Sequence, residues 1–350
     1  MNALENELDY PLGDVLPAPG ERLQIASGVF WIRMPLPFAL DHINLWLVRD
    51  NFRGREGWTL IDCGVATDET KKLWTKLFAS GLDGLPIVRI VCTHMHPDHL
   101  GLADWIAPQF NAPLWMTLGE YTMGRNQTFN AGLNVDVAVE HFRIHGVDNT
   151  MLDSIRQRNS NYFTSLVPAV PTSFHRIRAD LPVQIGDRSY KVFIGTGHSP
   201  EHASLYNDKD GLLFAGDMVL PRISTNVAVW EIEPESNPVQ WFIDSLAQYQ
   251  ECRDDTLVLP SHGRPFRKFK RRIEQLNEHH AERLEMVLAA CKKTPQHATD
   301  ILPVMFSRKF DVHHTTFAIC EALAHLHALW YRGQLTRQID GSGVVRFAAV

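Results

Sequence analysis

The sequence IVRIVCTHMHPDH, residues 87–99, joins a predicted strand to a dense group of polar side chains. Its first six residues are almost wholly apolar, which is typical of a strand buried on both faces. The motif that follows offers four potential metal ligands, namely His94, His96, Asp98 and His99. Histidines at i and i+2 cannot share one face of a helix, but they can share one side of a strand-to-loop turn. Because α/β proteins place their sites at the carboxyl ends of strands, we expect this loop to bind metal.

Three more polar residues stand at the ends of predicted strands in the second half of the chain. They are His198, Asp217 and His262, and each has a glycine close by. A single His or Asp in such a place is more often a cap or turn residue. Beside the 94–99 motif, however, all three could converge on one edge of a sheet. Imidazole and carboxylate groups suit zinc, and they also suit iron or manganese.

The order H-x-H-x-D-H, then His, then Asp, then His resembles the metallo-β-lactamase superfamily over roughly residues 20–265. The resemblance implies an α+β fold. It is a four-layer αββα sandwich, with two mixed sheets face to face, helices outside and the metals at one end. The pattern of apolar residues itself predicts strands over residues 23–33 and 42–49, followed by strand–helix alternation.

By the same resemblance, the seven polar residues divide between two divalent metal ions. The first ion would be bound by His94, His96 and His198. The second would be bound by Asp98, His99 and His262. Asp217 would bridge the two, where true β-lactamases commonly have Cys, and this difference points to the branch of glyoxalase II, lactonases and nucleases. Asp62 matches an Asp that mostly braces the metal loop in the family.

The chemistry of such a site follows from its charge. Two cations, with zinc preferred over iron or manganese, can lower the pKa of a bridging water toward about 7 and so supply hydroxide at neutral pH. The hydroxide attacks an electrophilic carbon or phosphorus. Asp98 is the predicted catalytic residue, because its carboxylate can hold the hydroxide by a hydrogen bond and pass its proton to the leaving group.

Several residues outside the seven are weaker candidates. His202, four residues after His198, could orient a ligand or simply begin a strand. The predicted lining of the substrate pocket is Tyr121, Tyr162, Arg222 and Asn226, although the two tyrosines fit ordinary packing better. The pairs His279–His280 and His313–His314 look like ligand pairs, but adjacent residues on a helix point in different directions. We therefore interpret both pairs as structural.

The chain divides into a predicted catalytic domain, residues 1–265, and a C-terminal domain, residues 266–350. A helical insertion is expected at about residues 118–175. The C-terminal domain shows three predicted helices and a hairpin signal around Asp340-Gly341-Ser342-Gly343, which together resemble a winged helix. This tail resembles the lactamase-β-like group, which includes a mitochondrial endoribonuclease and many unassigned bacterial hydrolases.

The overall composition sets wider limits. The net charge of -6 gives no global attraction to nucleic acid, and the sequence has no apolar run long enough to span a membrane. The N-terminus lacks the basic-then-apolar order of a signal peptide, so we expect a cytoplasmic protein without a membrane partner. The five cysteines are scattered and form no C-x-x-C pair, which indicates free thiols.

Three functions are compatible with these features. We favour hydrolysis of a small acyl substrate (a thioester, ester or lactone), with the insertion as a lid whose apolar walls would be Phe129, Leu133, Phe142 and Phe163. The first alternative is an endoribonuclease or phosphodiesterase acting on single-stranded RNA through the winged helix and the basic run 267–272. For that domain we prefer a pocket-closing or homodimer-forming role. The second alternative, a mononuclear iron oxygenase or a metal-holding protein, fits seven ligands less well.

Overall fold

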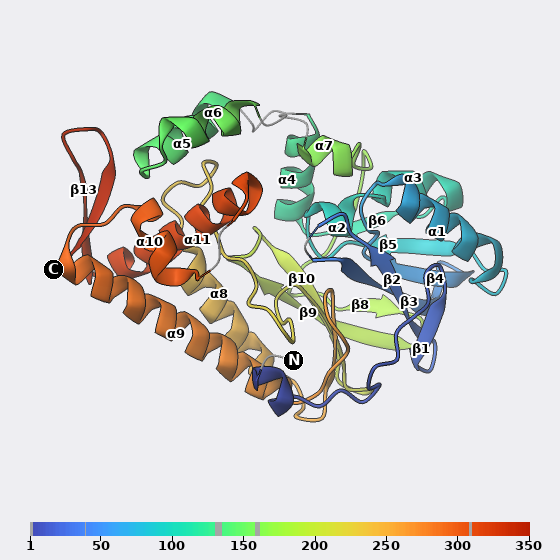
Figure 1. The fold of residues 1–350 in the computed structure, drawn as a ribbon. Helices are drawn as coiled ribbons and strands as arrows, with labels where there is room; N and C mark the ends of the chain where they lie inside the picture. The colour runs from blue at the N-terminus through green and yellow to red at the C-terminus, as the bar shows by residue number, and fades with distance from the viewer. Residues whose placement is uncertain (1–2, 39, 130–134, 158–161, 308–309) are drawn as a thin grey trace.

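The structure is a computed structural model that describes residues 3–38, 40–129, 135–157, 162–307 and 310–350. Figure 1 shows two sheets facing each other with helices on the outside of both. The first sheet has the strand order β1-β2-β3-β4-β5-β6-β7. The second has the order β12-β11-β10-β9-β8. Both sheets are mixed, because β4 to β7 pair in parallel in the first and β11 pairs in parallel with β12 in the second.

The strands have the following bounds. The first sheet contains β1 (Arg22–Ala26), β2 (Val29–Pro35), β3 (His42–Phe52), β4 (Arg55–Ile61), β5 (Ile87–Val91), β6 (Leu114–Met116) and β7 (His175–Arg176). The second sheet contains β8 (Val183–Ile185), β9 (Arg188–Gly195), β10 (His202–Asn207), β11 (Leu212–Gly216) and β12 (Leu257–Pro260). The C-terminal hairpin is β13 (Leu335–Ile339) with β14 (Val345–Ala349).

The helices fall into three groups. Those of the sandwich are α1 (Asp68–Ser80), α2 (Pro97–Leu100), α3 (Ala103–Phe110) and α8 (Pro238–Ala247), with 3-10 turns η1 (Ala3–Glu7) and η2 (Gln248–Glu251). Those of the insertion are α4 (Leu118–Thr128), α5 (Val135–Ile144), α6 (Asn149–Gln157) and α7 (Tyr162–Leu166). Those of the C-terminal region are α9 (Phe269–Lys293), α10 (Ala298–Met305) and α11 (Val312–Tyr331). None of the described helices is both long and apolar enough to cross a membrane.

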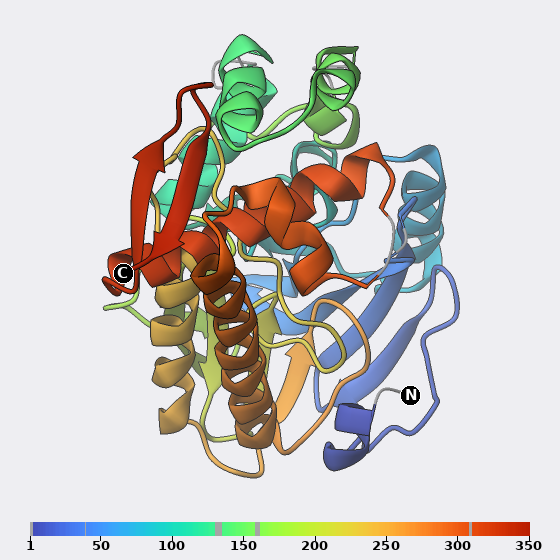
Figure 2. The ribbon, with the colours of Figure 1, turned by 60° about the vertical axis from the view of Figure 1, so that its left-hand side comes forward.

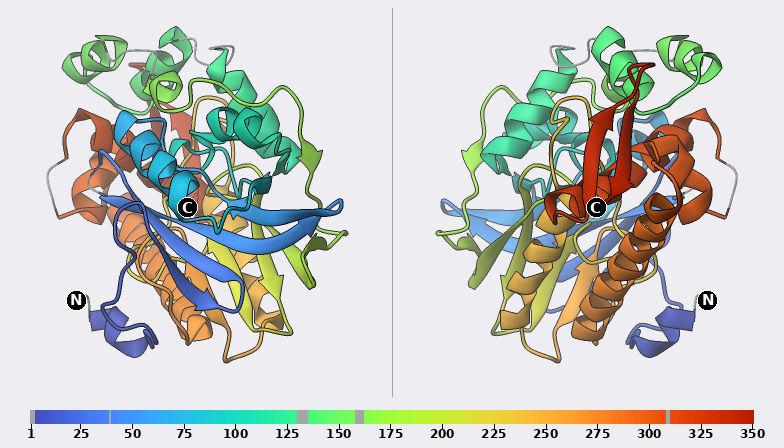
Figure 3. Two further views of the ribbon diagram at one scale, coloured as in Figure 1. Left: turned by 90° about the vertical axis from the view of Figure 1, so that its right-hand side faces the viewer. Right: turned by 90° about the vertical axis from the view of Figure 1, so that its left-hand side faces the viewer.

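Three apolar cores hold the layers together. The core between the sheets is built on large side chains such as Trp31, Trp46 and Phe214, and each buried side chain of this kind contributes about 1.5–3 kcal/mol. A second core joins the first sheet to α1 and α3, and a third joins the second sheet to α8 and α9. Figure 3 shows the resulting four layers from both sides. The predicted αββα sandwich is therefore confirmed.

One strand prediction was wrong in its extent. Residues 23–33 form two strands instead of one, because the chain turns at Ser27 and Gly28 and β2 pairs back against β1. Gly28 has φ +66°, a left-handed conformation that glycine adopts at little cost. Only Ser27 and Gly28 separate the apolar residues of the two strands, so the pattern resembles that of one longer strand.

The helical insertion rests partly on the C-terminal region, as Figure 2 shows for α5 and α6 beside α10 and α11. Phe142 lies in their shared core, and Thr299 Oγ1 donates to Gly146 O at 2.8 Å. Phe142 and Phe163 are thus core residues and not the walls of a lid, whereas Phe129 is exposed and Leu133 lies outside the described residues. The described part of the C-terminal region has three helices and a hairpin, and its interpretation as a winged helix stays a prediction.

Candidate metal centre

The structure brings all seven predicted metal-binding residues to one end of the sandwich. His94 and His96 lie on the turn after β5, and Asp98 and His99 lie at the start of α2. The other three come from the second sheet, where they follow β9, β11 and β12; they are His198, Asp217 and His262. Their ligand atoms form two clusters, and within each cluster all of these atoms lie within 4.8 Å of one another.

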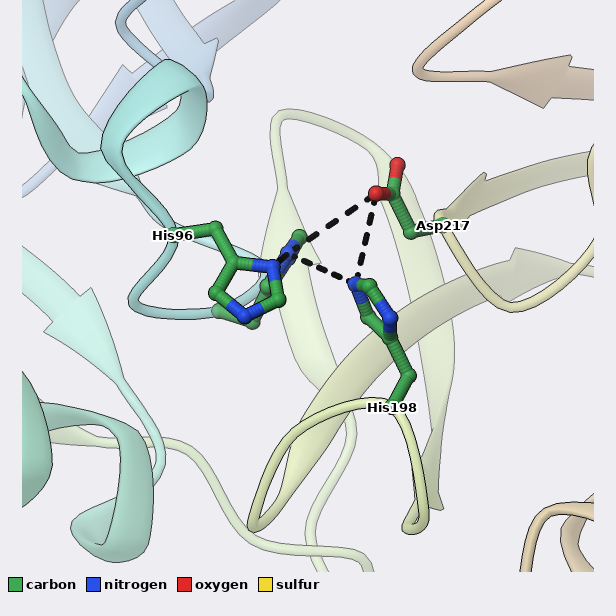
Figure 4. A group of neighbouring side chains, drawn as sticks. His96, His198 and Asp217 are labelled. Carbon is green, nitrogen blue, oxygen red and sulfur yellow. Dashed lines mark hydrogen bonds and ion pairs between the residues drawn. The ribbon is translucent and has the colours of Figure 1, made fainter. Parts of the chain in front are cut away.

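The first cluster consists of His94, His96, His198 and Asp217. His94 Nε2 lies 2.9 Å from His96 Nδ1 and 3.2 Å from His198 Nε2. Asp217 Oδ2 lies 3.3 Å from His198 Nε2. Figure 4 shows His96, His198 and Asp217 pointing toward one another from three separate segments.

The second cluster consists of Asp98, His99 and His262. Asp98 Oδ2 lies 3.3 Å from His262 Nε2 and 3.6 Å from His99 Nε2. Asp217 Oδ1 lies 3.4 Å and 3.5 Å from the same two nitrogens. The two oxygens of Asp217 therefore face one cluster each, which is the arrangement of a carboxylate between two cations.

The chemistry of these side chains fits a pair of divalent cations. His99 Nε2 and Asp217 Oδ1 are buried without a hydrogen-bond partner among the described residues, although buried polar atoms almost always have one. Burial and neighbouring imidazoles lower the pKa of His96 to about 3, so its ring is neutral, as a ligand must be. Burial also acts to lower the pKa of His99, but Asp62, Asp98 and Asp217 outweigh it and raise that pKa to about 9. The second cluster thus attracts positive charge.

Hydrogen bonds on the far side of the rings fix three of the histidines. His198 Nδ1 donates to Asn226 O, and His262 Nδ1 donates to His42 O, each at 2.8 Å. His99 Nδ1 bonds to the Asp62 carboxylate at 2.8 Å. Such a bond sets the tautomer and leaves Nε2 free toward the metal.

Comparison with known families agrees with this geometry. Residues 39–262 match the description "Metallo-beta-lactamase superfamily". This chain belongs to the metallo-β-lactamase superfamily. Residues 284–350, from within α9 to the end, match the superfamily's "Metallo-beta-lactamase-like, C-terminal domain".

Individual relatives cover nearly the whole chain. A solved structure of a beta-lactamase domain protein from Burkholderia ambifaria is 48% identical, covers 100% of both chains and has a TM-score of 0.94. The probable metallo-hydrolase YqjP of Bacillus subtilis (strain 168) is 26% identical over 324 residues, which are 90% of this chain and 96% of that protein. A metallo-β-lactamase family protein from Thermus thermophilus is 24% identical over 93% of this chain and 100% of that one, with a TM-score of 0.75. It supports the fold alone.

Asp62, which was predicted to brace the metal loop, follows β4 and contacts that loop. Its carboxylate accepts from Thr93 N at 2.8 Å and from Thr93 Oγ1, in addition to its bond with His99. Asp62 has φ +62°, a conformation that Asp and Asn tolerate better than most residues. One buried carboxylate thus joins the end of β4 to both the start of the metal loop and a candidate ligand.

Asp62→Asn should weaken metal binding by the second cluster by about 10- to 100-fold, the usual effect of losing a partner that orients a metal-binding histidine. Asn preserves the backbone turn but lacks the second acceptor oxygen that serves His99. A zinc titration against a chromophoric chelator measures each cluster's binding step. Asp83→Asn is the matched control, because Asp83 is exposed and also has positive φ (+54°). Wild-type affinity in both steps of Asp62→Asn would refute this role.

His202 also lies beside the ligands. It is fully buried, and its Nε2 accepts from Asp217 N at 3.1 Å, so the ring braces the backbone of the central carboxylate. The neighbouring Gly216 is needed for this contact, because a Cβ there would lie 2.2 Å from His202 Nε2.

The four predicted pocket residues have different surroundings. Tyr121 has the contacts of a packing residue, since its hydroxyl donates to Pro171 O at 2.9 Å and its ring stacks on Phe174. Arg222 is largely exposed, and its Nε lies 3.9 Å from a carboxylate oxygen of Glu5 in the N-terminal segment. Tyr162 begins α7 with a partly exposed side chain. Asn226 supports His198 through its carbonyl group.

Sequence reasoning missed two residues that hold the metal loops. Glu120 of α4 is fully buried and accepts from Met95 N at 2.9 Å, Ser199 Oγ at 2.6 Å and Glu201 N at 2.7 Å, so it ties the two histidine loops together. Asn44 of β3 donates to Pro260 O at 2.8 Å and to Gly263 O at 3.0 Å on either side of His262. Neither belongs to a local motif that would mark it.

Proposed function

We propose that this protein is a metal-dependent hydrolase that binds two divalent cations, preferably zinc, and cleaves a small acyl substrate such as a thioester, ester or lactone. The observation that carries the proposal is the position of Asp217 between two clusters of histidine and aspartate side chains. An arrangement of seven donors from separate segments of the chain suits two cations better than one.

Bound cations would supply a more acidic water and would polarise the oxygen of the group under attack. The chain's own residues supply orientation and proton handling. Of the two acidic candidate ligands, Asp217 faces both clusters, whereas Asp98 belongs to the second cluster alone. We therefore assign the holding and transfer of a proton to the Oδ atoms of Asp98. The far-side bonds of His198 and His262 keep their rings fixed during this cycle.

The relatives support the hydrolase class without defining the substrate. YqjP is named as a probable metallo-hydrolase, and the similarity spans almost its whole length. The Asp at position 217, in place of the Cys that the resemblance links to β-lactam cleavage, favours an acyl or phosphoryl substrate outside the β-lactams.

The basic run at the start of α9 gives less support to an RNA substrate than its sequence suggested. Arg271 pairs with Glu7, Glu274 and Glu278, and Lys270 pairs with Asp254. Arg272 is buried, and Arg267 donates to Asp255 O. The charges of Arg271 and Lys270 are thus matched within the chain, which weakens this run as an electrostatic surface for phosphates.

A panel assay with metal counting tests the proposal. The purified protein, loaded with zinc, should bind two ions per chain by elemental analysis and hydrolyse at least one thioester, ester or lactone, and a chelator should abolish this activity. Single-stranded RNA belongs in the same panel. Cleavage of RNA with no turnover of acyl substrates would overturn the acyl assignment, and one iron per chain would favour the oxygenase alternative.

A further inference from the structure

The segment between β11 and α8, residues 218–237, is a long loop that contacts the metal centre. All of its residues are described and they form no helix or strand, yet it directly follows Asp217 and supplies the carbonyl group that orients His198. A long irregular segment does not fix its own peptide planes, so they must be held by neighbours.

The neighbours that hold this loop belong mainly to the C-terminal helices α9 and α11. Arg272 donates to the carbonyls of Leu220 and Ile223 at 2.6 and 2.8 Å. Further along, the loop is bonded to α11 by Val229 N to Cys320 O (3.1 Å), His327 Nδ1 to Ser236 O (2.9 Å) and Tyr331 Oη to Glu235 O (2.6 Å). The C-terminal helices therefore hold both ends of the loop.

The bond nearest to the metal centre runs through Asn226. Its Nδ2 donates to Glu321 Oε2 of α11 at 3.1 Å, while its backbone O accepts from His198 Nδ1 at 2.8 Å. One residue thus connects a carboxylate of the C-terminal region to a candidate ligand of the first cluster. This bond joins two residues that are 95 positions apart in the chain, so it fixes Asn226 relative to α11.

We propose that Glu321 is a positioning residue of the metal centre: through Asn226 it fixes the carbonyl that orients His198, so that the C-terminal region sets the affinity of the first cluster. This inference rests on the proposed metal centre, but it concerns a residue of a different region. It gives the C-terminal region a role in metal binding that needs neither nucleic acid nor a second subunit.

The effect should be confined to one of the two clusters. His198 belongs to the first cluster only, and His262, which is oriented by His42 O, does not depend on the loop. Residues that orient a metal ligand usually account for 10- to 100-fold in metal affinity. Because Glu321 acts through Asn226 and not on the ring itself, we expect the lower end, about tenfold.

The test is a zinc titration of the full chain against a chromophoric chelator, with the two binding steps fitted separately. Glu321→Ala and Asn226→Ala should each weaken one step about tenfold and leave the other unchanged. The double variant should be no weaker than either single variant, because both remove the same bond. Glu321→Gln, whose amide oxygen can still accept from Asn226, should restore most of the affinity.

Thr299→Val is the structural control. It removes the bond from Thr299 to Gly146 O between the C-terminal region and the insertion, so it should lower the melting temperature of the metal-free chain without changing either zinc step. Equal weakening of both steps in Glu321→Ala, or wild-type titrations in both alanine variants, would overturn this inference while the dinuclear proposal stood. A wild-type chain that bound no zinc would overturn both.

Discussion

Asp217→Ala should lose bound metal and hydrolytic activity together. The buried carboxylate presents one oxygen to each cluster, so its removal takes a ligand and a negative charge from both sites at once. Loss of an orienting partner alone costs 10- to 100-fold in affinity, and loss of a shared ligand should exceed about 100-fold in both metal binding and kcat/KM. Elemental analysis after dialysis and the acyl-substrate assay measure the two effects.

A thermal measurement separates metal loss from misfolding. Zinc stabilises a folded chain that binds it, by about 2.7 kcal/mol when its concentration is 100 times the Kd. The melting temperature of the wild type should therefore rise on adding zinc, whereas that of Asp217→Ala should not. Asp180→Ala is the control, because Asp180 forms an exposed ion pair with Arg178 and is not one of the candidate metal ligands. Full metal content in Asp217→Ala would show that this carboxylate does not join the clusters.

The sequence allowed the metal loop to be predicted because its ligands lie close together in the chain. Four of them lie within residues 94–99, and the strand before them has an unmistakable apolar pattern. His198, Asp217 and His262 were predictable for a weaker reason, namely that each ends a strand and that their order matches the superfamily. The layered fold followed from the same order, whereas the turn at Gly28 did not.

The supporting residues could not be predicted, because their partners are distant in the chain. Glu120 bonds to Met95 and to Ser199, which lie on different loops 25 and 79 residues away. Neither bond has a spacing that a motif could capture. Asn226 was named as pocket lining for its nearness to Asp217, but its side chain bonds to Glu321, 95 residues later in the chain. Such contacts depend on how two regions pack, which periodicity does not encode.

Asp98→Asn should lower kcat by about 10²- to 10⁴-fold, the range for loss of a group that transfers a proton. The amide keeps an oxygen near His262 but cannot accept and release a proton at neutral pH. No atom of Asp98 belongs to the first cluster, so the metal of that cluster should be retained. Steady-state kinetics and elemental analysis test the two parts of the prediction on one sample.

Metal loss from the second cluster is the competing explanation for a slow Asp98→Asn variant, because Asp98 is also a candidate ligand there. The two explanations respond differently to added zinc. If Asp98 only binds metal, saturating zinc refills the second cluster and restores kcat. If its carboxylate also handles the proton, kcat stays low with two ions bound, since the amide cannot take over that function. Asp62→Asn weakens the same cluster but leaves the Asp98 carboxylate in place, so it should regain activity at the same zinc concentration. A full recovery of Asp98→Asn alongside it would leave Asp98 as a ligand alone.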